Sequence, residues 1–198
     1  ARVILRDVQT DASEVVLVRH GETEWSRDGK HTGRTDVPLT EHGRRQAQAV
    51  GAALRGRRFA LVLTSPLMRA LETCRLAGFG DVAVLRDELR EWDYGAYEGR
   101  KTIEIRKERP GWTLWRDGVP DGETIQEVAA RVDRVLVELR SVQGDSLLFA
   151  HGHVLRVLAA RWVGLKAQAG ALFELDPGSI SALGYERETS VIRLWNQR

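Results

Sequence analysis

The sequence of 198 residues has very little cysteine and lysine: one cysteine, Cys74, and four lysines among 30 basic residues. A single cysteine excludes an internal disulfide and a cysteine-clustered zinc site, and its helical surroundings predict a small buried apolar side chain. No apolar run is long enough to cross a bilayer, so we expect no membrane-spanning helix. The stretch ARVILRDVQTDASE has no positively charged leader followed by a long apolar core, so we expect a cytoplasmic protein without a secretory signal.

The chain also lacks a strong excess of either charge. The 30 basic residues face 28 acidic ones, giving a net charge of +2, and this balance does not suggest a nucleic-acid-binding protein. Arginine outnumbers lysine, and its planar, permanent cation suits phosphate and carboxylate groups, although a biased genome composition explains most of the count. We therefore expect a small-molecule partner, and the sequence leaves open whether copies of the chain form a homo-oligomer.

No repeat, low-complexity tract or linker interrupts the chain, so we expect one domain over residues 1–198. Apolar runs predict strands at Val15–Val18, Phe59–Leu63, Val82–Leu85 and Leu147–Ala150, and helical patterns lie at Thr40–Leu54, Pro66–Ala77 and Thr124–Arg140. This alternation predicts an α/β fold, a three-layer α/β/α sandwich with a mostly parallel central sheet. The stretch SISALGYERETSVIRLW predicts a closing hairpin, which would give the sheet an antiparallel strand.

Charged and imidazole side chains follow two of the predicted strands directly. Arg19 and His20 end the buried run of VVLVRHGETEW, and His151 and Gly152 follow Leu147–Ala150. Ligands of parallel α/β sheets bind beyond the carboxyl ends of the strands, so we expect these residues at one cleft. Two histidines in HGH could suggest a metal, but the segment has no further ligands at convincing spacing, so we expect neither a metal nor a cofactor.

The stretch TSPLMRALET predicts an anion site at the start of a helix. Pro66 suits the first helical position and Ser65 the cap, which leaves backbone N–H groups facing the cleft. Arg69 lies one turn further on and could reach the same anion, although for this residue taken alone we would favour a surface arginine on an ordinary capped helix. Two arginines, two histidines and a helix N-terminus at one cleft indicate phosphate chemistry with a histidine nucleophile.

The stretch LREWDYGAYEG places three carboxylates, Glu91, Asp93 and Glu98, among aromatic residues. A carboxyl group beside aromatic surface can act as a general acid at neutral pH, because burial favours its protonated form. The spacing does not choose among the three, and a loop pinned by aromatic packing explains any one of them as well. His42, on the polar side of its helix, is expected to be solvated.

These motifs together resemble the histidine phosphatase superfamily, the phosphoglycerate-mutase-like group. The matching stretches are RHGET, TGRTDVPLTEHGRRQA, TSPLMRALET, LREWDYGAYEG, DGET and HGH, in the order of the family. The resemblance implies that His20 is the phosphorylated nucleophile and Glu91 the proton donor. It further implies that Arg19, Arg69 and His151 form the phosphate pocket. One departure is Ser26, where many members carry asparagine.

Substrate contacts are expected from residues around these motifs: Thr23, Ser26, His31, Thr32, Gly33, Tyr94, Gly152 and Arg156. Several stretches look most like the sugar-bisphosphatase branch and the small bacterial acid phosphatases of the family. His31, Thr32 and Arg156 offer more polar groups than one phosphate can use, so we expect a second phosphate or carboxylate on the substrate. For Arg34 we favour a role in bracing the loop.

Two other functions stay open. A mutase must shelter its phosphohistidine from water, yet Glu91 and His151 lie only 60 residues apart and the interval leaves little room for a covering segment. This favours a phosphatase acting on small phosphorylated metabolites. A catalytically silent scaffold that binds phosphorylated ligands is disfavoured because all five residues of the implied catalytic set are present.

Overall fold

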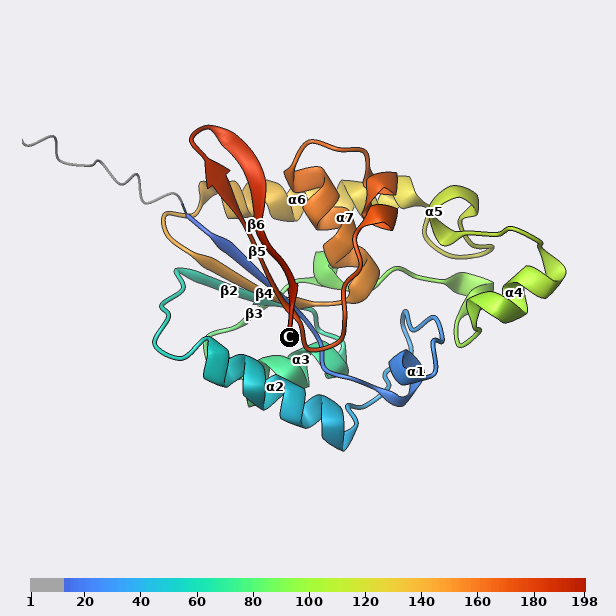
Figure 1. The fold of residues 1–198 in the computed structure, drawn as a ribbon, viewed down its shortest axis with the longest axis horizontal. Coiled ribbons are helices and arrows are strands. Elements are labelled where there is room, and N and C mark those ends of the chain that lie inside the picture. Colours follow the sequence, from blue (N-terminus) through green and yellow to red (C-terminus); the bar gives the residue numbers. More distant parts are fainter. Residues whose placement is uncertain (1–12) are drawn as a thin grey trace, which may run out of the picture.

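The computed structural model describes residues 13–198, so residues 1–12, on which the expectation about a secretory signal rests, lie outside the described part. Its six-stranded sheet has the order β3-β2-β4-β1-β5-β6 (Figure 1). The strands are β1 (Val15–Arg19), β2 (Leu61–Thr64), β3 (Val84–Leu85), β4 (Ser146–Ala150), β5 (Ile180–Glu186) and β6 (Thr189–Gln197). The first four run parallel, whereas β5 is antiparallel to both β1 and β6. The predicted mixed sheet and its closing hairpin are therefore confirmed.

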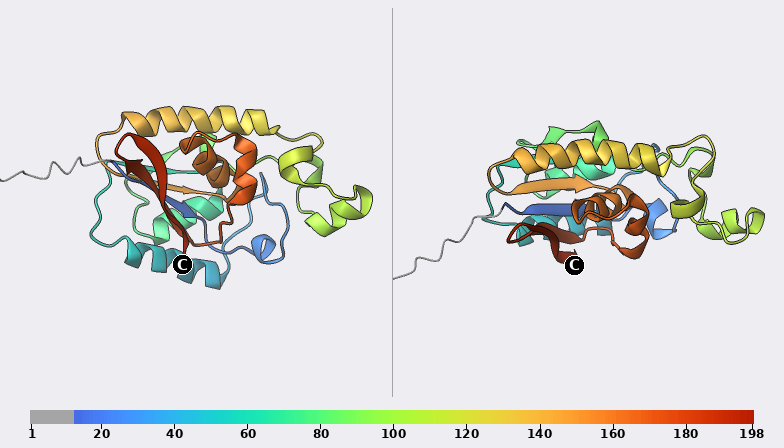
Figure 2. Two further views of the ribbon diagram at one scale, coloured as in Figure 1. Left: turned by 45° about the horizontal axis from the view of Figure 1, so that its top comes forward. Right: turned by 90° about the horizontal axis from the view of Figure 1, so that it is seen from above.

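Helices cover both faces of this sheet, as the three-layer prediction requires (Figure 2). One face packs against α2 (Glu41–Ala53) and α3 (Met68–Leu76), and the other against α6 (Ile125–Ser141) and α7 (Gly152–Trp162). Three short helices, α1 (Glu24–Arg27), α4 (Thr102–Glu108) and α5 (Leu114–Asp117), lie in the connections. Short 3-10 segments occur at Asp87–Leu89, Gly95–Tyr97 and Ala167–Leu172.

The central strand β1 shows why no polar residue interrupts its apolar run. Val16 and Val18 belong to the core under α2 and α3, while Val15 and Leu17 belong to the core under α6 and α7. All four are at most 2% exposed, because both faces of a parallel sheet are covered. The last residue of the strand, Arg19, therefore lies directly after the buried core, at the carboxyl end of β1.

Two of the predicted helix starts are confirmed by their caps. The Thr40 hydroxyl accepts the Gly43 N–H at the start of α2. At the start of α6, Thr124 and Glu127 form a reciprocal capping box, in which each side chain accepts a backbone N–H of the other. Cys74 is buried as predicted.

The predicted start of α3 was wrong. The helix begins at Met68, after Leu67, and no side chain caps it. Ser65 instead uses its hydroxyl within the site described below. The predicted strand over Val82–Leu85 shrinks to Val84–Leu85, whose side chains are exposed, since β3 is an edge strand paired on one side only.

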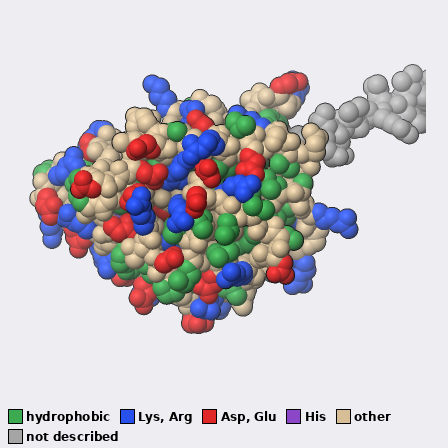
Figure 3. Space-filling model, turned by 180° about the vertical axis from the view of Figure 1, so that it is seen from behind, with side chains coloured by type: hydrophobic (Ala, Val, Ile, Leu, Met, Phe, Trp, Pro, Cys, Tyr) green, Lys and Arg blue, Asp and Glu red, His purple; other side chains and the backbone are tan. Residues whose placement is uncertain are grey.

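The surface shows no large field of one charge on the face seen in Figure 3, where Lys and Arg side chains alternate with Asp and Glu. Within residues 13–198, none of the helices combines the length and apolarity needed to span a bilayer.

Candidate active site

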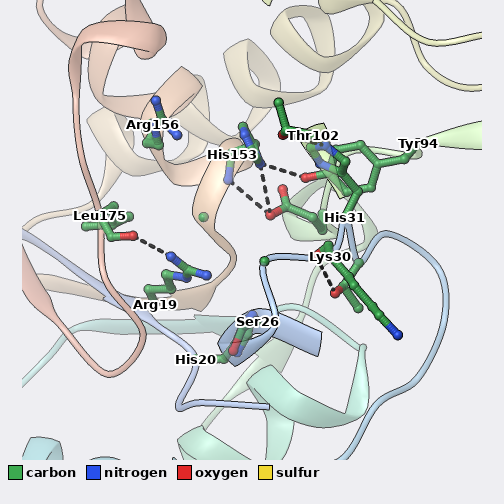
Figure 4. Close-up of a pocket in the computed structure, with 14 residues that line it drawn as sticks. Arg19, His20, Ser26, Lys30, His31, Tyr94, Thr102, His153, Arg156 and Leu175 are labelled. Carbon is green, nitrogen blue, oxygen red and sulfur yellow. Dashed lines mark hydrogen bonds and ion pairs between the residues drawn. The ribbon is translucent and has the colours of Figure 1, made fainter. Parts of the chain in front are cut away.

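A cavity of about 270 Å³ opens beyond the carboxyl ends of β1 and β4 (Figure 4). Nine residues predicted for the site line it: Arg19, His20, Ser26, His31, Thr32, Glu91, Tyr94, Gly152 and Arg156. Five lining residues were not predicted: Gly29, Lys30, Thr102, His153 and Leu175. Two further predicted residues, Arg69 and His151, are fully buried beside it, and the rings of His20 and His151 lie 5.1 Å apart.

His20 begins the site directly after β1. Its backbone N–H donates to the Ala150 carbonyl at 3.0 Å, and its Nδ1 lies 2.7 Å from the Gly21 carbonyl. Burial, and then the charges of Arg69 and Arg19, lower the pKa of His20 well below its usual value, so the ring is neutral. A carbonyl oxygen only accepts, so Nδ1 carries the proton and the lone pair lies on Nε2.

Two guanidinium groups lie beside this imidazole, that of the buried Arg69 and that of the half-buried Arg19. Arg69 donates from Nη1 to the Thr35 carbonyl and from Nη2 to those of Thr32 and Gly33, at 2.9–3.0 Å. Arg19 donates from Nη1 to the Leu175 carbonyl. These bonds fix both side chains, yet the Nε of each has no hydrogen-bond partner among the described residues.

His151 supplies a third unpartnered nitrogen. Its Nε2 lies 2.8 Å from the Ser65 hydroxyl, which also accepts the Leu67 N–H at 3.3 Å. Because that hydroxyl has its own hydrogen free for Nε2, Nδ1 of the imidazole is left as a donor, and it has no partner within residues 13–198. Burial, followed by the charge of Arg69, lowers the pKa of His151 well below its usual value. Buried donors without partners mark a place for an anion.

Gly152, the first residue of α7, lies against the Arg19 guanidinium. A Cβ at this position would come within 3.3 Å of Arg19 Cζ, which is closer than ordinary van der Waals contact. A glycine here therefore lets the helix N-terminus approach the pocket.

Among the three candidate carboxylates, Glu91 alone lines the cavity. Its carboxylate accepts three backbone N–H groups at 3.0 Å, from Trp92 and from His153 and Val154 at the start of α7. Backbone donors therefore hold this carboxylate, and the rings of Tyr94 and His153 line the same cavity.

Asp93 and Glu98 have structural partners instead. Asp93 accepts the Gly95 N–H and pairs with Arg34 at 2.8 Å, while Glu98 accepts the backbone N–H groups of Gly33 and Thr35. Arg34 is 78% exposed, and its ion pair matches the bracing role expected for it.

The outer wall of the cavity consists of uncharged rings. Tyr94 Oη lies 2.6 Å from His153 Nδ1, and the ring of His31 packs 4.9 Å from that of Tyr94. Burial lowers the pKa of His31 to about 4 and that of His153 well below its usual value, and it raises the pKa of Tyr94. These three side chains can therefore donate or accept hydrogen bonds without adding charge.

Cations flank this neutral wall. Arg156 lies over the Trp115 ring at 4.7 Å and donates from Nε and Nη2 to the carbonyls of Gly170 and Ala171. Lys30 stands over the ring of Trp25 at 5.5 Å. Both residues line the cavity, on different sides of it (Figure 4).

Two residues predicted to bind substrate lie outside the cavity lining. Thr23 caps α1 together with Ser26, because each backbone N–H donates to the hydroxyl of the other residue. The Gly33 N–H donates to the Glu98 carboxylate, and the Gly33 carbonyl accepts a hydrogen bond from Arg69. Both therefore shape the loop that carries Lys30 and His31.

Some residues of the cavity carry no signal in the sequence. Lys30 and Thr102 come from loop and helix-start positions that resemble any surface segment, and Leu175 contributes through its carbonyl. His153 could have been found, since it lies two residues after His151 on the same helix start. Across residues 13–198, no three His, Cys, Asp or Glu side chains meet in a metal-binding arrangement.

Comparison with known proteins places this geometry in a family. Residues 15–198 match the model of the histidine phosphatase superfamily (branch 1). An acid phosphatase of Mycobacterium tuberculosis is 40% identical over 187 residues, which cover 91% of this chain and 92% of that protein. A sedoheptulose 1,7-bisphosphatase of Saccharomyces cerevisiae is 39% identical over 186 residues, which cover 77% of this chain and 68% of that protein.

Solved structures agree with the sequence comparison. The product of an open reading frame of Mycobacterium tuberculosis superposes with a TM-score of 0.89 at 37% identity, over 93% of this chain and 97% of that one. The site and the fold that carries it lie within the matched residues. The chain therefore belongs to the histidine phosphatase superfamily.

Proposed function

We propose that the chain is a phosphatase that hydrolyses small phosphorylated metabolites through a phosphohistidine on Nε2 of His20. The observation that carries this proposal is the set of three buried, unpartnered nitrogens, Arg19 Nε, Arg69 Nε and His151 Nδ1, beside a neutral His20. Two permanent cations and an imidazole donor would hold the phosphoryl oxygens while the lone pair of Nε2 attacks phosphorus.

Glu91 completes the cycle in this proposal. In its protonated form it donates its proton to the leaving oxygen as the bond from phosphorus to that oxygen breaks. The resulting carboxylate then takes a proton from the water that attacks phosphohistidine, so that phosphate leaves and neutral His20 returns. General acid and base catalysis of this kind contributes about 10²–10⁴-fold.

Hydrolysis is favoured over mutase transfer by what lies between Glu91 and His151. The segment forms α4, α5 and α6; α6 packs on the sheet, and of the three helices only α4, through Thr102, contributes to the cavity lining. Little of this chain is then available to exclude water from a phosphohistidine. The silent-scaffold alternative is disfavoured because the nucleophile, both arginines and the carboxylate all lie in or beside one cavity.

The substrate class we propose is sugar phosphates and bisphosphates or phosphorylated acids. The neutral outer wall of His31, Tyr94 and His153 suits sugar hydroxyls, whereas Lys30 and Arg156 suit a second anionic group. The name of the yeast relative, a sedoheptulose 1,7-bisphosphatase, supports this class.

The proposal is tested by trapping the intermediate. Rapid quenching without acid, after mixing with phosphorus-labelled substrate, is expected to give an acid-labile, base-stable phosphoprotein whose label maps to His20. His20→Ala should lose both the label and turnover while keeping its circular dichroism spectrum. Label on another residue, or turnover in the variant, would remove His20 as the nucleophile.

A further inference from the structure

Arg131 is a buried cation that the proposed reaction does not use. It lies on α6, is 8% exposed, and all five of its N–H groups have acceptors. Nε and Nη2 donate to the two oxygens of Glu123 at 2.8 and 3.0 Å. The other three bonds go to backbone carbonyls, from Nη1 to Glu88 and Arg90 at 2.6 and 2.7 Å, and from Nη2 to Glu91 at 3.2 Å.

Glu123 also forms hydrogen bonds to the two residues after Glu91, Trp92 and Asp93. Its Oε2 accepts the Asp93 N–H at 3.0 Å, its own N–H donates to the Asp93 carbonyl, and its carbonyl accepts Nε1 of Trp92 at 2.8 Å. Residues 91–93 lie outside every helix and strand, so no ladder or helical bond holds their backbone. The ion pair of Arg131 and Glu123 takes the place of such a ladder.

Glu91 is thereby fixed from two sides. Its backbone is held by α6 through Arg131, and its carboxylate is held by the N–H groups of His153 and Val154 on α7. A second cavity, of about 100 Å³, is lined by Glu91, Glu123 and Arg131 among others, so this segment is not packed solidly against its neighbours. A carboxyl group displaced by 1 Å transfers its proton poorly.

We propose that Arg131, paired with Glu123, is the positioning residue that aims the Glu91 carboxyl group at the leaving oxygen. This inference rests on the proposed role of Glu91 as proton donor. Arg131 makes no hydrogen bond to His20, Arg19, Arg69 or His151. After burial and the charge of Arg69, its own charge helps to lower the pKa of His151, and a lysine at this position would keep that charge. We therefore expect its loss to affect protonation of the leaving oxygen and not phosphate binding.

The test compares two leaving groups. Arg131→Lys keeps the charge but loses the five hydrogen bonds of the guanidinium group. It should lower kcat/KM, which reports transfer to His20 and not the later attack of water, about 10-fold or more on an alkyl phosphate such as glycerol 3-phosphate. On p-nitrophenyl phosphate, whose leaving oxygen needs little protonation, the loss should stay within about 2-fold. Glu91→Gln should show the same selectivity to a larger degree, and inorganic phosphate should bind Arg131→Lys as it binds the wild type.

Three controls make the result decisive. Arg134→Met changes an exposed arginine of the same helix and should behave as the wild type. Glu123→Gln weakens the same hydrogen bonds with little change in volume and should repeat the selectivity if Arg131→Lys does not fold. In a Glu91→Gln background, Arg131→Lys should add less than about 2-fold on the alkyl phosphate, since no proton is left to position.

Each contrary result has its own meaning. Equal losses on both substrates in the Arg131 and Glu123 variants, with Glu91→Gln still selective, would overturn the inference and leave the proposed function standing. A Glu91→Gln variant without selectivity would remove the proton donor, and the inference with it, while the phosphohistidine test would still decide the nucleophile.

Discussion

Four of the five imidazoles of the chain gather in or beside the cavity and are kept uncharged there. Burial is the first cause for His20, His31, His151 and His153, and nearby arginines add to it for all but His31. A neutral ring can attack phosphorus or donate a hydrogen bond at neutral pH, whereas a protonated His20 could not attack. The same burial links the stability of the fold to pH.

His31 allows this link to be measured. In the folded chain its pKa is about 4, below the ordinary value of 6.5, so between these values the unfolded state binds more protons. Stability is therefore full above pH 6.5 and falls as the pH drops toward 4, by up to about 3 kcal/mol for this group.

We expect His31→Gln to lose less in Tm than the wild type between pH 7 and pH 4.5, measured by thermal melts. His42→Gln changes an exposed histidine on α2 and is the matched control. A variant with the same drop in Tm as the wild type would mean that His31 binds a proton as readily in the folded chain as in the unfolded one.

Arg156 carries the prediction about substrate. Its Nε and Nη2 are used to fix the side chain over Trp115, which leaves Nη1 to meet a second anion. Sugar bisphosphates should be hydrolysed with higher kcat/KM than monophosphates of neutral alcohols, and Arg156→Ala should narrow the gap about 10-fold, the value of a charge-assisted hydrogen bond.

A panel of phosphorylated metabolites measures this preference in both enzymes. Arg161→Ala, at the end of the same helix and paired with Asp133, is the control. No preference in the wild type, or the same preference in Arg156→Ala, would indicate a broad phosphatase whose arginine only packs on Trp115.

Site residues that directly follow a predicted strand could be predicted from the sequence, and the others could not. Arg19 and His151 come directly after apolar runs, so the architecture alone placed them at one cleft. Glu91 required resemblance to a family, because its neighbourhood is irregular backbone held by Arg131, a contact 40 residues along the chain that no local pattern encodes. Lys30 reaches the cavity through a loop whose path depends on Glu98, and local sequence did not reveal it.

The starts of the helices also depend either on nearby residues or on contacts that are distant in the sequence. Thr40 and Thr124 cap α2 and α6 through hydroxyls three residues from the bonded N–H, so the sequence predicted both starts. Ser65 carries an equally good capping signal, but His151, brought by β4, engages its hydroxyl, and the helix starts later at Met68. The hydroxyl still accepts the Leu67 N–H at 3.3 Å, so it makes a local and a tertiary hydrogen bond together without capping the helix.

The start of α2 is also pressed directly against the loop after His20. A Cβ on Gly43 would lie 2.1 Å from the Glu22 carbonyl oxygen, and one on Gly21 would lie 2.3 Å from the Gly43 carbonyl oxygen. Two glycines are needed here because backbone meets backbone without room for a side chain.

Gly43→Ala is expected to destabilise the fold by about 1–3 kcal/mol, since either helix or loop must move. It should also lower kcat, because Glu22 lies only two residues from His20. Chemical denaturation and steady-state kinetics measure the two effects, with exposed Gln48→Ala on the same helix as the control. An unchanged midpoint and rate would show that the contact relaxes freely.

At the scale of the whole molecule, strands that lie side by side in the sheet come from distant parts of the sequence. The strand β1, near the start of the described chain, lies between β4 and β5, which come from residues 146–150 and 180–186. The apolar alternation predicted the layers well, but it did not predict this order, since every buried strand has a similar composition.

That placement of β1 sets the timing of events during synthesis. On the ribosome, His20 emerges early on a strand whose two partners have yet to be translated, and contacts this distant in sequence form slowly. In the same way, Arg19 cannot form its hydrogen bond to the Leu175 carbonyl, and His20 cannot pack beside the ring of His151, until those later residues have been translated. A nascent chain that has not reached β4 and β5 therefore presents His20 without the neighbours that surround it in the fold, and the cavity can form around His20 only after residues 146–186 have been translated.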